Sequence, residues 1–189
     1  MQTIVVATVG LCGTGKSETT RYIGKSLGFE TVYFGGQVLE QVRQQGLEVN
    51  KDNEKMVRER LRAEQGMAVM AKLSLPRIKA SLEAGTGVVI DGLYSYAEYV
   101  FLKQELGDSF YVVAIHVPKP LRYQRLGARP VRPLSADQVD ERDLAEIRNL
   151  EKSDPIVLAD YHLVNDASME KLHQRVDRVL GAITGSDST

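Results

Sequence analysis

Short runs of apolar and β-branched residues alternate along the chain with longer stretches in which apolar residues recur every three or four positions. The short runs predict strands over residues 3–9, 31–34, 87–91, 110–117 and 162–165. The sequences GVVID and FYVVAIHV are nearly continuous in apolar residues, which is typical of strands buried on both faces. Strands of this kind in alternation with helices predict an α/β fold, a three-layer sandwich in which helices flank a five-stranded parallel sheet.

Two of the predicted helices have recognisable boundaries. A helix over residues 17–27 should stop at Gly28, because glycine readily takes the left-handed conformation that ends many helices. The longest helical stretch covers residues 50–83 and keeps its apolar residues on one face. We expect Gly66 and Pro76 each to kink or divide it.

Two later helices carry N-terminal capping residues. Ser135 and Gln138 form a capping-box pattern that opens a helix continuing to residue 150. Ser168 is expected to cap a final helix that continues to residue 183.

The composition is that of an ordinary globular protein and argues against several functional classes. Of the 189 residues, 43% are apolar and 26% are charged, and the formal net charge of -1 provides no basic surface for DNA or RNA. Cys12 is the only cysteine, so no disulfide can form within the chain. The first apolar run is too short to cross a membrane and lacks the features of a secretory signal. We therefore expect a cytoplasmic protein with no nucleic-acid or membrane partner.

The segment GLCGTGKS at residues 10–17 matches the phosphate-binding pattern G-x-x-x-x-G-K-[ST] in full. It follows a predicted buried strand and opens a predicted helix, an arrangement in which backbone N–H groups and the helix N-terminus surround a polyphosphate. Lys16 is expected to reach the β- and γ-phosphates of ATP, and the Ser17 hydroxyl is expected to bind Mg²⁺. The residues of this segment expected to bind ATP are Gly10, Gly13, Thr14, Gly15, Lys16, Ser17 and Glu18. A glycine-rich turn without a ligand is the alternative.

The spacing of the glycines argues against a dinucleotide-binding loop. That loop needs G-x-G-x-x-G, whereas Gly13 and Gly15 are followed by Glu18, and the second predicted strand ends in VYFGG without an acid to hold a ribose. Cys12 lies inside the segment, where we favour a small side chain that fills a tight turn over a redox switch.

Asp91 ends the third predicted strand and is followed by Gly92. A carboxylate there would lie at the carboxyl edge of the sheet beside the phosphate-binding segment, where it can hold Mg²⁺ directly or through water. The other interpretation is an aspartate that caps the next turn. We favour the metal ligand.

Arginines cluster around the segment ARPVRPLSADQVDERD, which lies between the last two predicted strands. Phosphoryl transfer spreads negative charge over the transferred group, and mobile arginines are a usual source of the compensating positive charge. Arg125, Arg129 and Arg142 flank the sequence RPVRP, which has the character of a short lid, and are candidates for catalysis. Solvated helix positions explain Arg122 and Arg148 at least as well.

With these residues in place, the chain resembles the P-loop kinases of the nucleoside monophosphate kinase type over nearly its whole length, and adenylate-kinase relatives in particular. GLCGTGKSE is similar to their phosphate loop, FGGQVLEQV to the start of their monophosphate-binding region, and VVIDGLYS to their strand ending in Asp-Gly. VPKPLRYQRLGARP and ERDLAEIR are similar to the helices that enter and leave their lid. The chain also resembles predicted kinases that are labelled dephospho-coenzyme A kinase-like.

The resemblance implies a P-loop NTPase fold and one kinase domain over residues 1–189. The expected parts are a core of residues 1–34, 84–128 and 155–184, a helical acceptor-binding insertion at about 35–83 and a lid at about 129–142. In the family, arginines at the edges of the lid contact ATP and the transferring phosphate. The resemblance gives these roles to Arg125, Arg129 and Arg142, with Arg125 also counted as ATP-binding.

The chain departs from the family where adenylate kinases bind their acceptor. Adenylate kinases carry Asp-x-x-Arg after the second strand, whereas this chain has QVLE at residues 37–40. They also carry an arginine soon after Asp-Gly, whereas this chain has Leu93 and Tyr94 in that region. The sequence YFGGQ also lacks the carboxylate that dephospho-coenzyme A kinases carry after the second strand.

Candidate acceptor-binding residues are Gly36, Arg58 and Tyr94. Arg60 and Arg62 lie beside Arg58 in the sequence VRERLRAE, which is equally typical of a charged helix face. The sequence thus predicts an ATP- and Mg²⁺-dependent kinase that acts on a small nucleotide or nucleotide-like acceptor. The alternatives are a dephospho-coenzyme A kinase and an ATP-binding regulatory protein that has no acceptor.

Overall fold

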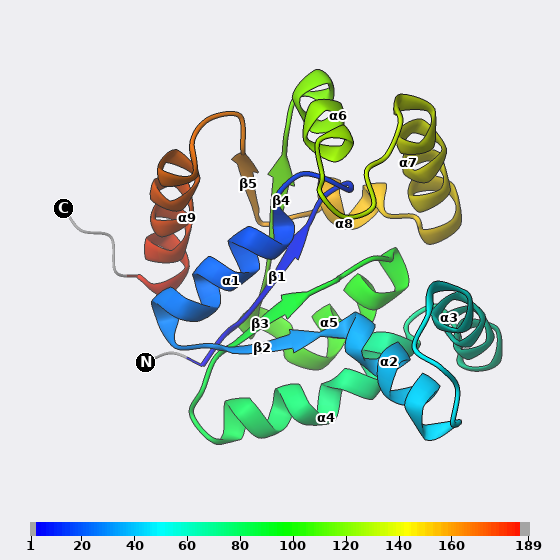
Figure 1. Ribbon diagram of the computed structural model, residues 1–189. Coiled ribbons are helices and arrows are strands. Elements are labelled where there is room, and N and C mark those ends of the chain that lie inside the picture. Colours follow the sequence, from blue (N-terminus) through cyan, green and yellow to red (C-terminus); the bar gives the residue numbers. More distant parts are fainter. Residues whose placement is uncertain (1–2, 186–189) are drawn as a thin grey trace.

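Five parallel strands form the sheet, as the apolar runs predict, in the order β2-β3-β1-β4-β5 (Figure 1). Their bounds in this computed structural model are β1 Val5–Val9, β2 Glu30–Tyr33, β3 Val88–Asp91, β4 Phe110–His116 and β5 Tyr161–Val164. Each strand ends within two residues of its predicted bounds. The structure describes residues 3–185, so residues 1–2 and 186–189 of the predicted single domain lie outside the described part.

Helices cover both faces of the sheet. Their bounds are α1 Lys16–Leu27, α2 Phe34–Gln44, α3 Lys51–Gln65, α4 Val69–Glu83, α5 Tyr96–Leu106, α6 Lys119–Gly127, α7 Ala136–Leu150, α8 Ser153–Val157 and α9 Met169–Thr184. Helices α1 and α9 pack on one face, and α4 and α5 pack on the other. This is the three-layer arrangement that the alternation of strands and helices predicts.

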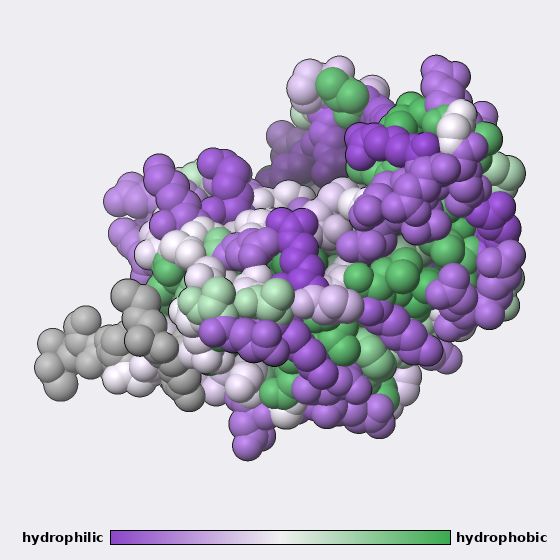
Figure 2. Space-filling model, turned by 90° about the horizontal axis from the view of Figure 1, so that it is seen from below, coloured by the Kyte–Doolittle hydropathy of each residue, from purple (hydrophilic) through white to green (hydrophobic). Residues whose placement is uncertain are grey.

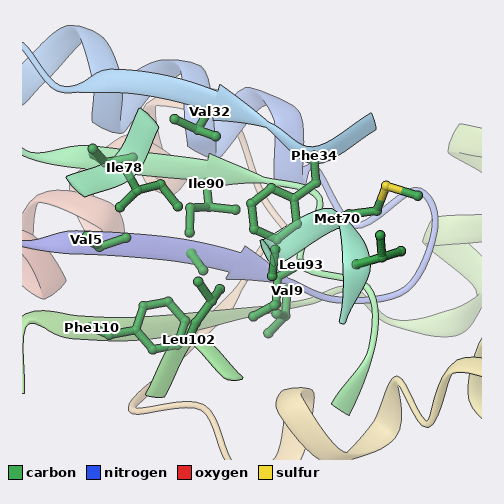
Figure 3. Close-up of a cluster of buried hydrophobic side chains, with 14 of the residues drawn as sticks. Val5, Val9, Val32, Phe34, Met70, Ile78, Ile90, Leu93, Leu102 and Phe110 are labelled. Atoms are coloured by element: carbon green, nitrogen blue, oxygen red, sulfur yellow. The ribbon is translucent and has the colours of Figure 1, made fainter. Parts of the chain in front are cut away.

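The buried residues of the α4 and α5 face form the larger apolar cluster (Figure 3). Ile78 of α4 and Leu102 of α5 lie against strand residues such as Ile90, and all three have 0% exposed surface. Phe34 of α2 and Met70 of α4 belong to the same cluster. The helices that follow β2 therefore share the core of the sheet, which fixes their position relative to the strand ends.

The two glycines end helices as expected, whereas the proline lies inside a continuous helix. Gly28 has φ 65 and ends α1, and Gly66 has φ 86 and separates α3 from α4. Pro76 lies inside α4, which continues without interruption from Val69 to Glu83. The prediction that Gly66 divides the long stretch is confirmed, whereas Pro76 does not divide it.

The predicted caps of the two later helices are confirmed. Ser135 accepts from the backbone N–H of Gln138 to open α7, and Ser168 accepts from that of Lys171 to open α9. Helices α2, α5, α6 and α8 were absent from the prediction made from the periodicity, and only the family resemblance indicated α6. The sequence holds a signal for α5, because Ser95 and Glu98 form a second capping box.

The surface mixes polar and apolar residues. Hydrophilic residues cover much of the face seen in Figure 2, and apolar residues interrupt them in small groups. None of the helices described between residues 3 and 185 is long and apolar enough to cross a membrane.

Candidate functional site

The phosphate-binding segment connects the end of β1 to the start of α1 and depends on glycine conformations. Gly10, Gly13 and Gly15 have φ values of 143, 87 and 96, which side chains disfavour. A Cβ at Gly10 would lie 2.5 Å from the carbonyl oxygen of Ile115, and a Cβ at Gly15 would lie 2.5 Å from Nδ2 of Asn165. The segment is therefore shaped as a close backbone turn that a larger residue would disrupt.

Side chains donate hydrogen bonds to several backbone carbonyls of this turn. The Thr14 hydroxyl and Lys16 Nζ both donate to the carbonyl of Leu11, at 3.0 and 2.8 Å. Asn165, at the end of β5, donates to the carbonyl of Thr14 at 2.9 Å. The first N–H groups of α1 have no acceptor within the helix. The carbonyls of Leu11 and Thr14 are thus bonded to side chains of the protein. The free N–H groups at the start of α1 can donate to an anion.

A cavity of about 380 Å³ adjoins this turn. Its lining residues are Cys12, Gly13, Gly15, Lys16, Ser17, Glu18, Asp91, Tyr94, Arg129, Arg142, Glu146 and Lys152. We call it the nucleotide cavity. The structure thus brings together Lys16, Ser17 and Asp91 with the two lid-edge arginines Arg129 and Arg142. Gly10, Thr14 and Arg125 are not among the lining residues.

Charges in the nucleotide cavity are strongly coupled. Burial, followed by the positive charge of Lys152, lowers the pKa of Lys16 to about 8, although Glu146 and Asp91 oppose the shift. Burial raises the pKa of Asp91, and the charge of Lys16 and the Ser17 hydroxyl oppose that shift. A polyanion between these groups would favour the charged form of Lys16.

The residues fit a magnesium ion that is bound together with phosphates. The Ser17 hydroxyl interacts with the Asp91 carboxylate, so both oxygen ligands lie at one place in the cavity. In residues 3–185 no group of three or more His, Cys, Asp or Glu side chains could hold a metal by itself. Magnesium in phosphoryl-transfer sites needs only one or two protein ligands, because phosphates and water supply the others.

A second, larger cavity of about 710 Å³ is lined mainly by residues of α2, α3 and α7. Figure 1 shows where these three helices lie relative to the sheet. Its lining residues are Tyr33, Phe34, Gly35, Val38, Glu54, Arg58, Glu59, Arg62, Met67, Met70, Tyr94, Arg142, Ala145, Glu146, Asn149 and Leu150. We call it the acceptor cavity, after the acceptor-binding region that the sequence predicts. Arg58 and Tyr94 line it as predicted, whereas Gly35 rather than Gly36 reaches its surface. Tyr94, Arg142 and Glu146 line both cavities.

The predicted catalytic arginines occupy different environments. Arg129 is exposed on the loop between α6 and α7, and Nε of Arg142 donates to Glu146 Oε1 at 3.0 Å. Arg125 donates instead to the carbonyl of Asn165 at 2.9 Å, next to the phosphate-binding turn. In this structure Arg125 therefore supports the turn and contacts neither cavity.

The interpretation of Arg122 as a solvated helix residue is wrong. Its side chain is 5% exposed and forms a two-pronged ion pair with Asp143 of α7, with a distance of 2.9 Å for the longer contact. It also donates to the carbonyl of Cys12 at 3.0 Å. Arg122 therefore joins α6, α7 and the phosphate-binding turn. Arg148 is exposed, as a solvated position requires.

Sequence reasoning missed two buried charges at the junction of the cavities. Lys152 has 0% exposed surface, and its Nζ donates to Glu146 Oε2 at 2.6 Å. The helical period of α7 could have found Glu146, because this residue follows the buried Val139 by two turns. Nothing in the local sequence distinguishes Lys152 from a surface lysine.

The loop after β3 is held by a buried carboxylate. Glu98 Oε2 accepts the backbone N–H groups of Tyr94 at 2.7 Å and Ser95 at 3.1 Å. Burial raises the pKa of Glu98 to about 7, and the charge of Arg62 opposes the rise. Because these contacts fix the backbone of Tyr94, Glu98 sets the place of that ring between the two cavities.

Protein families and sequences match this chain over most of its length. Residues 6–149 match a family described as an AAA domain. A UPF0200 protein of Thermococcus onnurineus is 33% identical over 183 residues, which cover 95% of this chain and 98% of the relative. A UPF0200 protein of Aeropyrum pernix is 35% identical over 188 residues, which cover 97% of this chain and 96% of the relative.

Solved structures, several of them named as kinases, share the fold. Shikimate kinase from Acinetobacter baumannii in complex with shikimate superposes with a TM-score of 0.58 at 20% identity, covering 99% of this chain and 96% of that one. A gluconokinase from Sinorhizobium meliloti superposes with a TM-score of 0.59 at 12% identity, covering 99% of both chains. TT1252 from Thermus thermophilus superposes with a TM-score of 0.64 at 20% identity, and the match covers 100% of both chains. At these identities the comparison establishes the P-loop kinase fold.

Proposed function

The chain belongs to the AAA-domain family and to the UPF0200 proteins, and we propose that it is an ATP- and Mg²⁺-dependent kinase acting on a small nucleotide or nucleotide-like acceptor. One observation carries the proposal. The nucleotide cavity and the acceptor cavity share three residues, Tyr94, Arg142 and Glu146. A phosphoryl donor in the first cavity and an acceptor in the second would meet at these residues.

The nucleotide cavity supports the donor half of this reaction. When bound, ATP supplies the phosphoryl group and Mg²⁺ neutralises part of its charge. Lys16 provides an ammonium group at the helix N-terminus, and Ser17 and Asp91 provide the oxygen ligands for the metal. Arg129 and Arg142 also line this cavity, where they would hold the charge that develops during transfer.

The acceptor cavity supports the acceptor half. Arg58 and Arg62 of α3 offer cationic groups, and Phe34, Val38 and Met70 offer apolar surface. A cavity of this size and mixed character suits a small molecule with a charged group and an apolar or ring-shaped part. The kinase neighbours named for shikimate and gluconate support a small hydroxyl-bearing acceptor.

We also propose that residues of about 129–142 act as a lid over the nucleotide cavity and that residues of about 35–83 bind the acceptor. Arg129 is exposed on the loop before α7, so closure of this segment would move its guanidinium onto the phosphates. Closure would also exclude water from the transferred group, which limits hydrolysis of ATP.

The test is transfer of label from γ-labelled ATP in the presence of Mg²⁺. The panel contains nucleosides, nucleoside monophosphates, hydroxy acids and dephospho-coenzyme A. We expect label on one class of small molecule with the wild-type protein and none with Lys16→Ala, which should fold normally. Label on dephospho-coenzyme A alone would select that narrower kinase. ATP binding without any labelled product would favour a regulatory ATP-binding protein and contradict the proposal.

A further inference from the structure

Lys152 is a buried lysine whose side chain lines the nucleotide cavity. It directly precedes α8, and its side chain is 1% exposed. Its Nζ donates to Glu146 at 2.6 Å and lies 4.8 Å from the centre of the Tyr94 ring. Arg142 donates to the other carboxylate oxygen of Glu146 at 3.0 Å, so one carboxylate is shared by two cations. This group of three charges therefore keeps one net positive charge beside the cavity.

The Lys152 ammonium has hydrogen-bonding capacity that the protein leaves unused. An ammonium group donates up to three hydrogen bonds, and among residues 3–185 the only hydrogen-bond acceptor found for Nζ is Glu146. Buried donors without an acceptor cost free energy. An acceptor that enters the cavity from outside would use the remaining N–H groups.

The charges around the nucleotide cavity also favour an anionic ligand. Four cations and three carboxylates line it: Lys16, Arg129, Arg142 and Lys152, with Glu18, Asp91 and Glu146. Glu18 is already paired with Arg21 on the surface of α1. The two ammonium groups also interact, because the charge of Lys152 lowers the pKa of Lys16. A ligand with several negative charges would relieve this repulsion.

The backbone before Lys152 adopts a conformation that residues other than glycine rarely take. Glu151 has φ 50 and ψ 39, in the left-handed region, where it ends α7. Its own side chain is exposed, while the next residue points inward. Such conformations cluster at functional sites, where the surrounding structure holds them. The turn at Glu151 is what places the Lys152 side chain in the cavity.

From these observations we propose that Lys152 is a further catalytic residue, which donates a hydrogen bond to the phosphoryl group during its transfer. The inference rests on the proposed function. In that transfer the bond between the γ-phosphorus and the oxygen shared with the β-phosphate breaks. A bond from this phosphorus to an oxygen of the acceptor forms, and a proton carried by that oxygen passes to solvent when the site reopens. Lys152 and Lys16 stabilise the charge on the phosphoryl oxygens, and Glu146 positions Lys152.

The experiment measures the affinity for ADP and for ADP with aluminium fluoride, which mimics a phosphoryl group during transfer. Lys152→Gln removes the charge but retains an N–H group that can donate to Glu146. We expect its ADP affinity to stay within about threefold of wild type and its affinity for the fluoride complex to fall about 100-fold. Lys152→Arg, which keeps the charge, should recover part of the loss. Calorimetry in Mg²⁺ buffer gives both affinities without an acceptor.

Controls separate this role from a purely structural one. Lys79→Met removes a lysine paired with Glu105 at 2.7 Å on the surface and should leave both affinities unchanged. If Lys152→Gln does not fold, Lys152→Met combined with Glu146→Gln removes both buried charges and should show the same selective loss. Wild-type affinity for the fluoride complex in a folded, uncharged variant would overturn the inference. Failure of the wild-type protein to bind ADP and the fluoride complex would overturn the proposed function itself.

Discussion

At the scale of single residues, Asp91 has two possible roles that one substitution distinguishes. Asp91→Asn keeps the shape of the side chain and removes the charge that would attract Mg²⁺. We expect the gain in ATP affinity that Mg²⁺ provides to fall by about tenfold or more, with little change in melting temperature. Titration calorimetry with and without Mg²⁺ measures the gain. An unchanged gain together with a lower melting temperature would instead assign Asp91 to capping of the next turn.

The buried carboxyl group of Glu98 should make the stability of the fold depend on pH. Its pKa is raised from 4.5 to about 7 in the folded protein by burial, with Arg62 of α3 as the opposing charge and the N–H groups of Tyr94 and Ser95 as hydrogen-bond donors. Between these two values the folded state binds more protons than the unfolded state, so the contribution of Glu98 to the free energy of unfolding falls as pH rises from about 4.5 to about 7.

Glu98→Gln removes this titration while keeping an oxygen that accepts the two N–H groups. Relative to wild type, the variant should therefore gain stability steadily across that pH interval and change little above it. Urea denaturation at several pH values measures the difference. A constant difference between the two proteins from pH 4.5 to 7 would show that Glu98 titrates normally.

At the scale of secondary-structure elements, the Arg122–Asp143 pair connects α6 to α7. Arg122→Met leaves Asp143 as a buried charge without its partner, which should lower the free energy of unfolding by about 3–5 kcal/mol. The double variant with Asp143→Leu should recover a large part of that loss, because both charges are gone. Denaturant titration of the three proteins gives the values. Equal stability of the single and double variants would contradict the importance of the pair.

The loop between α6 and α7 is where the lid proposal can be tested. If Arg129 moves onto the phosphates, amide hydrogen exchange in residues 128–135 should slow with ADP and aluminium fluoride but much less with ADP alone. Arg129→Ala should abolish the difference. Arg132→Ala is the matched control, because Arg132 is exposed on the same loop and lines neither cavity. Equal exchange in all liganded states would show that this loop does not close.

Strand positions were more predictable than helix positions for a physical reason. Strands buried on both faces produce continuous apolar runs, so β3 and β4 stand out in the sequence. Helix α2 follows β2 without any intervening turn, and α8 has only five residues, so neither produces a long periodic pattern. Pro76 looked like an interruption, but a helix that packs on the sheet can tolerate one lost hydrogen bond.

At the scale of the whole molecule, the part of the site that is local in sequence was predictable and the rest was not. The phosphate-binding turn is eight consecutive residues with a recognisable pattern. The two cavities share Tyr94 after β3 and Arg142 and Glu146 on α7, and Lys152 before α8 lines the nucleotide cavity beside them. These residues lie close together only because the chain folds back across the sheet edge, and no local sequence pattern indicates that they do.

The central claim is that the two cavities form one chamber in which a phosphoryl group passes directly to a small molecule. The most direct measurement uses ATP whose γ-phosphoryl oxygens carry ¹⁸O, incubated with the protein, Mg²⁺ and a deproteinised pool of cellular small molecules. Mass spectrometry should find a single class of phosphate ester that retains all the transferred label and is absent when Lys16→Ala replaces the wild type. Label found only in inorganic phosphate, or no label released from ATP, would contradict the claim.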